Sequence, residues 1–173
     1  EELKAKGAKA KDPIEKFNVA HGLYESGYVP RNGDWKDNLN LDALQLLSPY
    51  RPGFYGILGL NKLIHAKFRN TDFKDPDTAF YNGDKLIRVS NYYTGYGRKK
   101  NLILSNGSIG VVNNHKGGET KYYFKDADFV LKWIDDEEQF DLAYSITVHK
   151  SQGSDFSNVF LIIPNKLNLL NKE

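Results

Sequence analysis

A polar segment near the carboxyl end of the chain carries the residue types best suited to binding chemistry. His149 to Asp155, here called the polar segment, reads HKSQGSD and lies between two apolar runs, Leu142 to Val148 and Val159 to Ile163. A buried strand that delivers hydroxyl, imidazole, amine, amide and carboxylate groups to one sheet edge is typical of phosphate and nucleic-acid sites in open α/β sheets. The polar segment is therefore the first candidate site.

A second candidate is Arg51, which follows another apolar run. Leu41 to Leu47 ends at Ser48-Pro49, as expected of a short buried strand. After a turn, helical periodicity continues from Ile57 to Asn70. This strand, turn and helix would place Arg51 on the ligand side of an α/β sheet. A surface arginine in an ordinary ion pair is the alternative interpretation.

A third candidate combines cations with aromatic rings. The loop Thr94 to Lys100 reads TGYGRKK and follows two further tyrosines, which brings three rings close in sequence to Arg98, Lys99 and Lys100. Such a mixture suits a nucleic-acid backbone with base stacking. Exposed hairpin loops also carry this composition without a ligand, so both interpretations stay open.

The elements around these candidates divide into two patterns. Asp12-Pro13 predicts the start of an amphipathic helix over about residues 13 to 26. From Phe80 to Trp133 the pattern becomes short alternating runs separated by Gly and Asn, with hairpin signals at Asn106-Gly107 and Gly117-Gly118. It predicts a small antiparallel barrel. The predicted strands are Lys85 to Val89, Asn101 to Leu104, Ser108 to Val112, Thr120 to Phe124 and Phe129 to Trp133.

Composition excludes several function classes. The 173 residues include 24 basic and 22 acidic side chains, and a net charge of +2 does not by itself indicate nucleic-acid binding. Cysteine is absent and the four histidines lack ligand spacing, so we expect no metal held by protein side chains alone. No apolar run suits a membrane span or a signal peptide. We expect a soluble, cytoplasmic protein with no membrane partner.

Three stretches together resemble one family. LAYSITVHKSQGSDFSNVFLIIP (142–164) resembles the LAYAxTVHKSQGSEF motif and following strand of RecD-like superfamily 1 DNA helicases. LQLLSPYRPGFYGILGLNKLI (44–64) resembles their strand, Ser-Pro, arginine-glycine loop and helix. GDKLIRVSNYY (83–93) and NGSIGVV (106–112) resemble the Src-homology-3-like barrel inserted in the second motor domain. The resemblance covers about Leu41 to Pro164, and TVHKSQG is its most specific part.

The resemblance implies an α/β fold: a partial RecA-like parallel-sheet domain of the P-loop-NTPase type, with the barrel inserted as a small antiparallel module. The RecA-like part would comprise residues 1–78 and 139–173, and the barrel residues 79–138. The family's motor binds ATP with Mg²⁺ between two RecA-like domains. The implied partners are therefore single-stranded DNA and the first RecA-like domain of the same parent chain.

Roles for individual residues also follow from the resemblance. Arg51 matches the catalytic arginine that reaches the γ-phosphate and neutralises its developing charge. Gln152, Gly153 and Asp155 match the part of the motif nearest the nucleotide, with Asp155 standing where the family usually has Glu. Thr147 and His149 match the part that faces single-stranded DNA, and Lys150 would supplement them.

The implied function is ATP-dependent DNA helicase activity, in which ATP hydrolysis drives translocation along single-stranded DNA and duplex unwinding. The chain contains no G-x-x-x-x-G-K-S/T loop and ends before the family's final Thr-Arg motif, so the isolated chain is expected to be inactive. One alternative is a non-motor nucleic-acid-binding module that uses the barrel and its basic loop. Another is a degenerate interaction domain that has kept only the fold.

Overall fold

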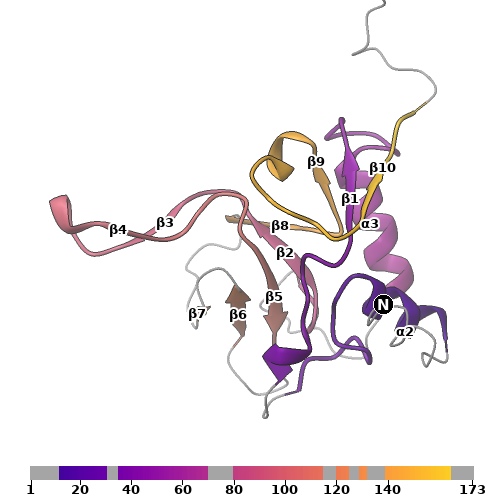
Figure 1. Ribbon diagram of the computed structural model, residues 1–173, viewed down its shortest axis with the longest axis horizontal. Coiled ribbons are helices and arrows are strands. Elements are labelled where there is room, and N and C mark those ends of the chain that lie inside the picture. The colour runs from indigo at the N-terminus through magenta and orange to yellow at the C-terminus, as the bar shows by residue number, and fades with distance from the viewer. Residues whose placement is uncertain are drawn as a thin grey trace, which may run out of the picture.

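The structure, a computed structural model, describes residues 12–30, 35–69, 80–114, 120–124, 129–131 and 139–164. These residues form an α/β fold with a parallel sheet, a larger antiparallel sheet and a two-stranded arm (Figure 1). The helices are α2 (Pro13–Ala20) and α3 (Ile57–Phe68), with 3-10 turns η1 (Trp35–Asn38), η2 (Gly97–Lys99) and η5 (His149–Ser151). The strands are β1 (Gln45–Ser48), β2 (Lys85–Arg88), β3 (Tyr92–Thr94), β4 (Asn101–Leu104), β5 (Ile109–Asn113), β6 (Lys121–Phe124), β7 (Phe129–Leu131), β8 (Phe140–Leu142), β9 (Ser145–Thr147) and β10 (Val159–Leu161).

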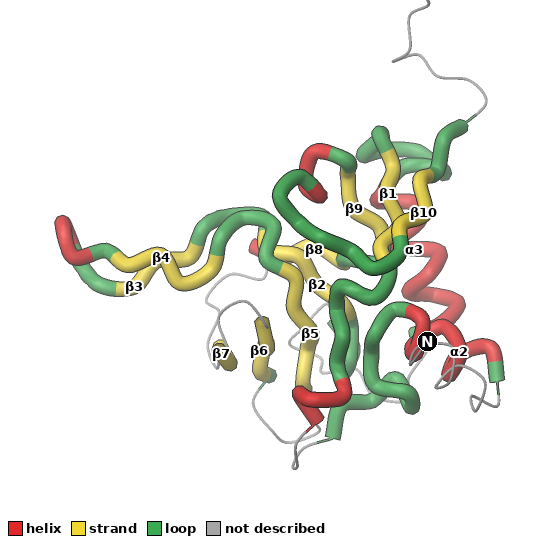
Figure 2. Tube along the Cα trace, in the orientation of Figure 1, coloured by secondary structure: helices red, strands yellow, loops and turns green. Residues whose placement is uncertain are grey.

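The parallel sheet has the strand order β10-β1-β9. Leu46 in the central strand lies opposite Phe160 on one side and Ser145 on the other. Helix α3 follows β1 and packs against β9. Figure 2 shows these strands and α3 at one end of the molecule, with the antiparallel sheet next to them. The strand, turn and helix predicted around Arg51 are confirmed, although β1 begins four residues later than the predicted run.

Helix α2 is shorter than predicted. It begins after Asp12, whose Oδ1 accepts hydrogen bonds from the backbone N–H groups of Ile14 and Glu15 at 2.8 and 2.9 Å. It ends at Ala20, six residues before the predicted end, because Gly22 adopts φ +65° and its carbonyl accepts a hydrogen bond from the Asn40 N–H at 2.8 Å. A glycine with positive φ ends the helical path, and apolar periodicity beyond it does not continue the helix.

The antiparallel sheet has the order β7-β6-β5-β2-β8. No pairing joins β7 to β8 among the described strands, so the described strands form an open sheet. Its two faces contact different apolar clusters: Ile87 packs in the cluster shared with the parallel sheet, whereas Leu86 packs in a second cluster with Phe124 and Phe140. Both faces of the central strand β2 are therefore buried.

The prediction of a hairpin at Asn106-Gly107 is wrong. The residues on either side belong to different sheets, because β4 pairs with β3 while β5 pairs with β2. The β2–β5 pair and the β3–β4 pair follow each other along one two-stranded ribbon. The turn at Asn106-Gly107 lies between the two pairs, and the ribbon ends at η2. The other predicted hairpin signal, Gly117-Gly118, and the predicted strand end at Trp133 lie outside the described residues.

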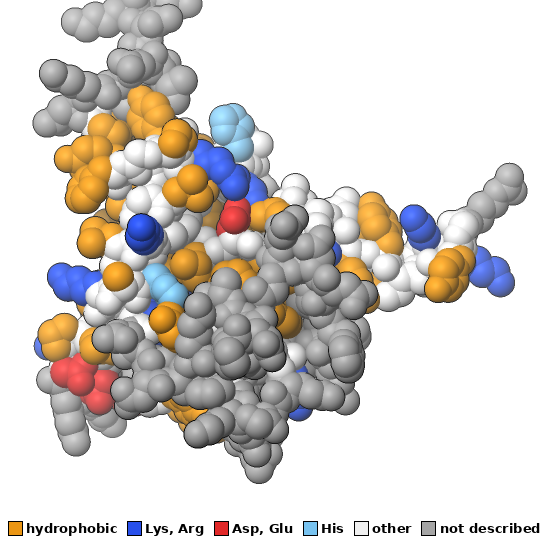
Figure 3. Space-filling view, turned by 180° about the vertical axis from the view of Figure 1, so that it is seen from behind, with side chains coloured by type: hydrophobic (Ala, Val, Ile, Leu, Met, Phe, Trp, Pro, Cys, Tyr) orange, Lys and Arg blue, Asp and Glu red, His pale blue; other side chains and the backbone are white. Residues whose placement is uncertain are grey.

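The two-stranded β3–β4 arm extends away from both sheets (Figure 1). The space-filling view shows basic and apolar side chains near its end (Figure 3). Tyr96 at the tip is 94% exposed, and Lys99 and Lys100 are exposed beside it. The arm thus presents an aromatic ring and cations to solvent. The described helices, with 8 and 12 residues, are both too short to cross a membrane.

The sequence pattern suggests that the apolar run Leu142 to Val148 is one strand. The structure divides it between two strands. Its start belongs to β8 in the antiparallel sheet and its end to β9 in the parallel sheet. Two buried amide side chains hold the backbone between them. Asn61 Nδ2 donates to the carbonyls of Leu142 and Ser145 at 2.8 and 2.9 Å, and Gln45 Nε2 donates to that of Ala143 at 3.0 Å. The chain can change sheets because these amides satisfy its buried backbone groups.

A buried ionic cluster connects the helices to the antiparallel sheet. The Asp84 carboxylate lies 3.2 Å from Arg69 Nε, 2.8 Å from His65 Nε2 and 2.8 Å from the Tyr144 hydroxyl. It also accepts a hydrogen bond from the Tyr81 N–H at 2.7 Å. Burial and the Asp84 charge raise the pKa of Tyr144 well above its ordinary value, so its hydroxyl remains a donor. Each oxygen of the buried carboxylate therefore has two donors.

Candidate functional site

The candidate site lies at the carboxyl edge of the parallel sheet, where β1 and β9 end side by side. Ser48 and Thr147, the last residues of these strands, are register partners. Each hydroxyl accepts a hydrogen bond from a backbone N–H just beyond the strand: Tyr50 N donates to Ser48 at 3.2 Å, and Lys150 N donates to Thr147 at 3.3 Å. The segments that follow β1 and β9 therefore turn at the same edge, which is the ligand side of open α/β sheets.

The backbone that carries Arg51 is tied to the start of α3. The Arg51 carbonyl accepts a hydrogen bond from Leu58 N at 3.1 Å, and Ser48 Oγ donates to the Tyr55 carbonyl at 2.7 Å. The Arg51 side chain extends outward with 55% of its surface exposed, and its Nη2 lies 3.4 Å from Asp141 Oδ2. The two interpretations of Arg51 from the sequence are a place on the ligand side of the sheet and a surface ion pair. Arg51 follows the carboxyl end of β1 and also forms a long, exposed ion pair with Asp141.

The polar segment begins with the 3-10 turn η5. This turn is closed by Ser151, whose Oγ donates to the Val148 carbonyl at 2.8 Å, and by the Thr147 hydroxyl described above. His149 is exposed on the turn, as are Gln152 and Gly153 after it. The hydroxyl of Thr147 therefore shapes the turn, while the His149 imidazole faces solvent.

Lys150 differs from its neighbours because its side chain turns inward. Its Nζ atom is out of contact with solvent and has no hydrogen-bond partner among the described residues. Burial lowers the pKa of Lys150, the Asp141 carboxylate raises it, and Arg51 lowers it. Lys150 and Arg51 thus lie within electrostatic reach of the same carboxylate, although they come from different strands.

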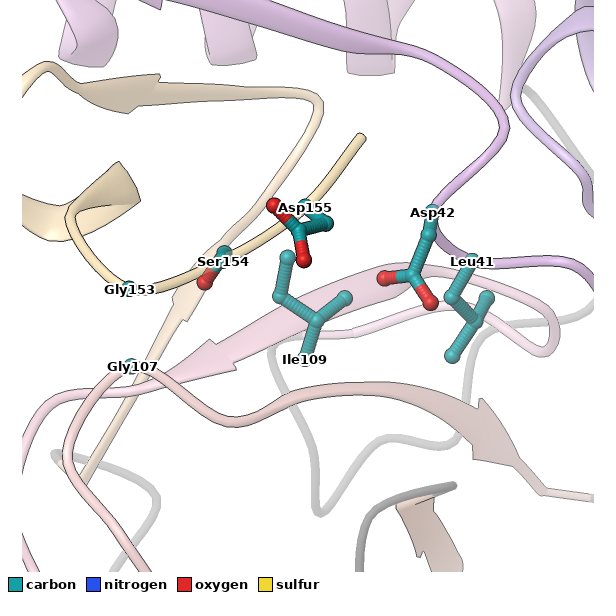
Figure 4. A pocket seen from close by; sticks show the side chains of 7 residues that line it. All are labelled: Leu41, Asp42, Gly107, Ile109, Gly153, Ser154 and Asp155. Atoms are coloured by element: carbon teal, nitrogen blue, oxygen red, sulfur yellow. The ribbon is translucent and has the colours of Figure 1, made fainter. Parts of the chain in front are cut away.

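The second half of the polar segment faces elsewhere. Gly153, Ser154 and Asp155 line a pocket of about 340 Å³ together with Leu41, Asp42, Gly107 and Ile109. The carboxylates of Asp155 and Asp42 both point into this space above Ile109 (Figure 4). The pocket lies between the two sheets, and Arg51 does not line it.

The structure therefore separates the predicted site residues into three places. Arg51 and Lys150 both follow strands that end at the carboxyl edge of the parallel sheet. Gly153 and Asp155 line the pocket between the sheets, with Gln152 exposed before them. Lys99 and Lys100 are carried on the arm, away from both; the backbone of Arg98 lies in η2 at the same tip.

Asp141 and Asn61 contribute to the site but were not predicted from the sequence. Asp141 follows Phe140 in a short strand, and no pattern marked it as a partner of Arg51. Asn61 had a usable signal, because it lies four residues after Ile57 and three before Ile64, the buried face of α3. An amide on an otherwise apolar helix face indicates a buried hydrogen-bonding role.

The residues at the sheet edge fit one part of ATP, its phosphates. A guanidinium and an ammonium group offer charged donors to phosphate oxygens. No group of three or more possible metal ligands occurs in the part of the chain that the structure describes. The fit therefore concerns the phosphate and not the Mg²⁺ ion.

Comparison with known proteins points to one kind of relative. The chain is 30% identical over 132 residues to the RecBCD enzyme subunit RecD of Buchnera aphidicola subsp. Schizaphis graminum, covering 75% of this chain and 22% of that protein. It is 27% identical over 176 residues to the ATP-dependent RecD2 DNA helicase of Deinococcus radiodurans, covering 89% of this chain and 23% of that protein. The chain thus spans about a fifth of the length of these relatives.

A further relative carries no functional description. An uncharacterised protein of Methanocaldococcus jannaschii is 34% identical over 150 residues, covering 73% of this chain and 13% of that protein. No model of a protein family matches the chain. The motif around the polar segment and the similarity to RecD and RecD2 agree, and the chain resembles RecD-like helicases over 75 to 89% of its length.

Proposed function

We propose that this chain is part of an ATP-dependent DNA helicase, to which it contributes the second RecA-like motor domain and an inserted small barrel. The RecA-like part would comprise residues 1–78 and 139–173, and the insertion residues 79–138. The observation that carries this proposal is the shared edge of β1 and β9, where Arg51 and the polar segment emerge side by side. The parallel order of β10, β1 and β9 supports the RecA-like assignment.

The second apolar cluster supports the inserted module. Among the described residues, its buried members come from residues 80–124 and from Phe140 in β8. The pairing of β8 with β2 brings the chain back beside its point of departure, as an insertion requires. The closed barrel itself is part of the proposal. Backbone chemical shifts and long-range backbone contacts from NMR, including those for residues 125–138, would test whether the sheet closes.

In the proposed mechanism, the parts of one short segment contact different ligands. Arg51 would neutralise charge that develops on the transferred phosphoryl group. Thr147 and His149 would hold the backbone of single-stranded DNA, while Gln152, Gly153 and Asp155 would respond to the nucleotide. Because η5 joins the two halves of this segment, a shift on one side would change the grip on the other, which couples hydrolysis to movement along DNA. The phosphate-binding loop and the ligands of Mg²⁺ would come from the first RecA-like domain of the parent protein.

The test uses the full-length protein that contains this chain. Arg51→Ala should lower ATP turnover by about 10³-fold or more with only a small change in nucleotide affinity. His149→Ala should weaken binding of single-stranded DNA and unwinding, with ATP affinity unchanged in the absence of DNA. Lys67→Ala, on the exposed face of α3, is the matched control. Unchanged turnover in Arg51→Ala would refute the role of Arg51, and an equal loss of ATP affinity in His149→Ala would refute the division of roles.

A second candidate function rests on the arm. Its tip exposes Tyr96 with Lys99 and Lys100, and the Lys100 Nζ lies 6.0 Å from the ring centroid of Tyr93. Cations beside exposed rings favour a module that binds single-stranded nucleic acid without a motor. The chain itself should then bind an oligothymidylate with an affinity that falls as salt rises. Tyr96→Ala should weaken it by about tenfold, as expected for loss of one stacked base. An affinity unchanged in Tyr96→Ala would remove the arm from consideration.

A further inference from the structure

The carboxyl edge of the parallel sheet presents two cations in matching positions. Arg51 lies three residues after Ser48, and Lys150 lies three residues after Thr147, its register partner in the neighbouring strand. In both places a strand-terminal hydroxyl accepts a backbone hydrogen bond and fixes the first turn of the loop. The two side chains are therefore brought to one edge by paired strands and not by a flexible loop alone.

Asp141 provides the only negative charge that the described contacts give to these two cations. It extends from β8, where it lies opposite Ile87, and its Oδ2 is 3.4 Å from Arg51 Nη2. The side chain of Asp141 is 30% exposed and that of Arg51 is 55% exposed. An ion pair with such exposure contributes only about 0–1 kcal/mol, so it is easily exchanged for a better partner.

Lys150 lacks such a partner. Its Nζ is buried with no hydrogen-bond acceptor in the described part of the chain, although each ammonium group carries three donors. Burying a cation without acceptors is unfavourable, and the lowered pKa of Lys150 has this cause. The trio of Arg51, Lys150 and Asp141 keeps one positive charge in excess. An anion bound at this edge would offset the excess charge and supply the acceptor that Lys150 lacks.

We propose that Arg51 and Lys150 together form a site for a terminal phosphate at the carboxyl edge of the parallel sheet, with Asp141 holding Arg51 until that phosphate arrives. The inference rests on the proposed function and deepens it, because the phosphate would belong to the nucleotide. A terminal phosphate carries close to two negative charges at neutral pH, whereas a DNA phosphodiester carries one. Two cations at one edge, of which only Arg51 is paired with a carboxylate among the described residues, match the former. Lys150 is thereby assigned to the nucleotide and not to the DNA backbone.

The test measures binding of inorganic tripolyphosphate to this chain by isothermal titration calorimetry at constant ionic strength. Arg51→Gln and Lys150→Gln should each weaken binding by about tenfold, the usual effect of losing a charge-assisted hydrogen bond. Asp141→Asn should strengthen binding several-fold, because the carboxylate no longer competes for Arg51. Lys99→Gln on the arm removes the same charge far from the site and should change affinity by less than about twofold. A gain of affinity in Asp141→Asn cannot arise from misfolding.

The same variants titrated with an oligothymidylate separate the two sources of phosphate. Lys150→Gln should leave the affinity for the oligothymidylate unchanged. The proposal is overturned if Lys150→Gln weakens binding of the oligothymidylate and leaves binding of tripolyphosphate unchanged. It is also overturned if Asp141→Asn does not strengthen tripolyphosphate binding, or if the unaltered chain does not bind tripolyphosphate at millimolar concentration. If tripolyphosphate behaves as expected while Arg51→Ala leaves ATP turnover of the full-length protein unchanged, the phosphate site stands and the motor role of Arg51 falls.

Discussion

Two of the described clusters bring an aspartate to an arginine, at Asp84 and at Asp141, and they differ in how completely their polar groups are hydrogen-bonded. Asp84 is fully buried and receives four donors, while Arg69 uses its remaining N–H groups on Asn18 and on the carbonyls of Gly27 and Asn82. Asp141 and Arg51 are partly exposed and share a single contact of 3.4 Å, with an unpartnered lysine beside them. A saturated cluster indicates a structural role. An unsaturated cluster on a ligand edge leaves room for a ligand.

The largest expected effect concerns the saturated cluster. Arg69→Met should lower the free energy of unfolding by about 3–5 kcal/mol, because it leaves the Asp84 carboxylate buried beside fewer donors. Urea unfolding followed by circular dichroism would measure it. Lys67→Met, which removes an exposed charge from the last turn of α3, two residues before Arg69, should change stability by less than about 0.5 kcal/mol. Similar small losses in both variants would contradict the structural role of the cluster.

The packing around Arg69 provides the next test. Gly83 has φ +80°, and a Cβ there would lie 2.4 Å from the Gly27 carbonyl oxygen and 2.5 Å from Arg69 Nη2. Gly83→Ala should therefore cost about 2–4 kcal/mol from backbone strain and overpacking together. Gly53→Ala, near Arg51, is the matched control: its φ is +87° but no atom lies within 4 Å of the added Cβ, so only the strain of about 1 kcal/mol remains. Thermal unfolding of the two variants compares the clusters directly, and equal losses would show that packing around Arg69 is not tight.

A third test uses pH to probe the buried region near Tyr144. His21 lies 5.8 Å from the Tyr144 ring, and burial, assisted by Lys85, lowers its pKa to about 3. Between about pH 3 and its ordinary value near 6.5, the unfolded chain binds a proton that the folded chain does not, so stability falls as pH falls through this range. This histidine should contribute a slope of up to about 1.4 kcal/mol per pH unit. Urea midpoints of His21→Gln measured from pH 6.5 to 4.5 should show a shallower fall than the unaltered chain; parallel curves would be the contrary result.

The smallest effect is expected at the unsaturated cluster. Asp141→Asn should change the free energy of unfolding by no more than about 1 kcal/mol, because the ion pair with Arg51 is exposed. Chemical denaturation at low and moderate salt would measure it. A loss comparable to that of Arg69→Met would show that Asp141 is a structural residue, and would remove the contrast between the two clusters.

The sequence correctly predicted the strand and helix whose positions depend on local residue patterns. Ser48-Pro49 marked the end of β1, and the run from Ile57 marked α3, because strand ends and helix periodicity are local properties. The parallel edge that carries Arg51 followed from these elements and from the family motif. The roles assigned to Thr147, His149, Gln152 and Asp155 remain predictions.

The features that the sequence did not predict depend on contacts between residues that are distant in the chain. The apolar run Leu142 to Val148 looks the same as one strand or as two, and the choice depends on amide donors from Asn61 and Gln45. The inward direction of Lys150 depends on a 3-10 turn closed by side-chain hydroxyl groups, for which the apolar pattern contains no signal. Likewise, Asn106-Gly107 has hairpin composition, but the partners of β4 and β5 decide that it interrupts a ribbon.

The pairing of β1 with β9 has a consequence for how the chain folds. Leu46 lies opposite Ser145, so forming the parallel sheet requires closing a loop of about 100 residues. The entropy cost of closure grows only with the logarithm of loop length, so doubling this length would cost about 0.6 kcal/mol. Surface loops in the segment between the two strands can therefore change length at little cost in closure entropy, provided that the packed elements keep their contacts and β8 still delivers the backbone to Asn61. Because non-local pairing is slow to form, we expect the antiparallel sheet to fold first and to bring the carboxyl edge together afterwards.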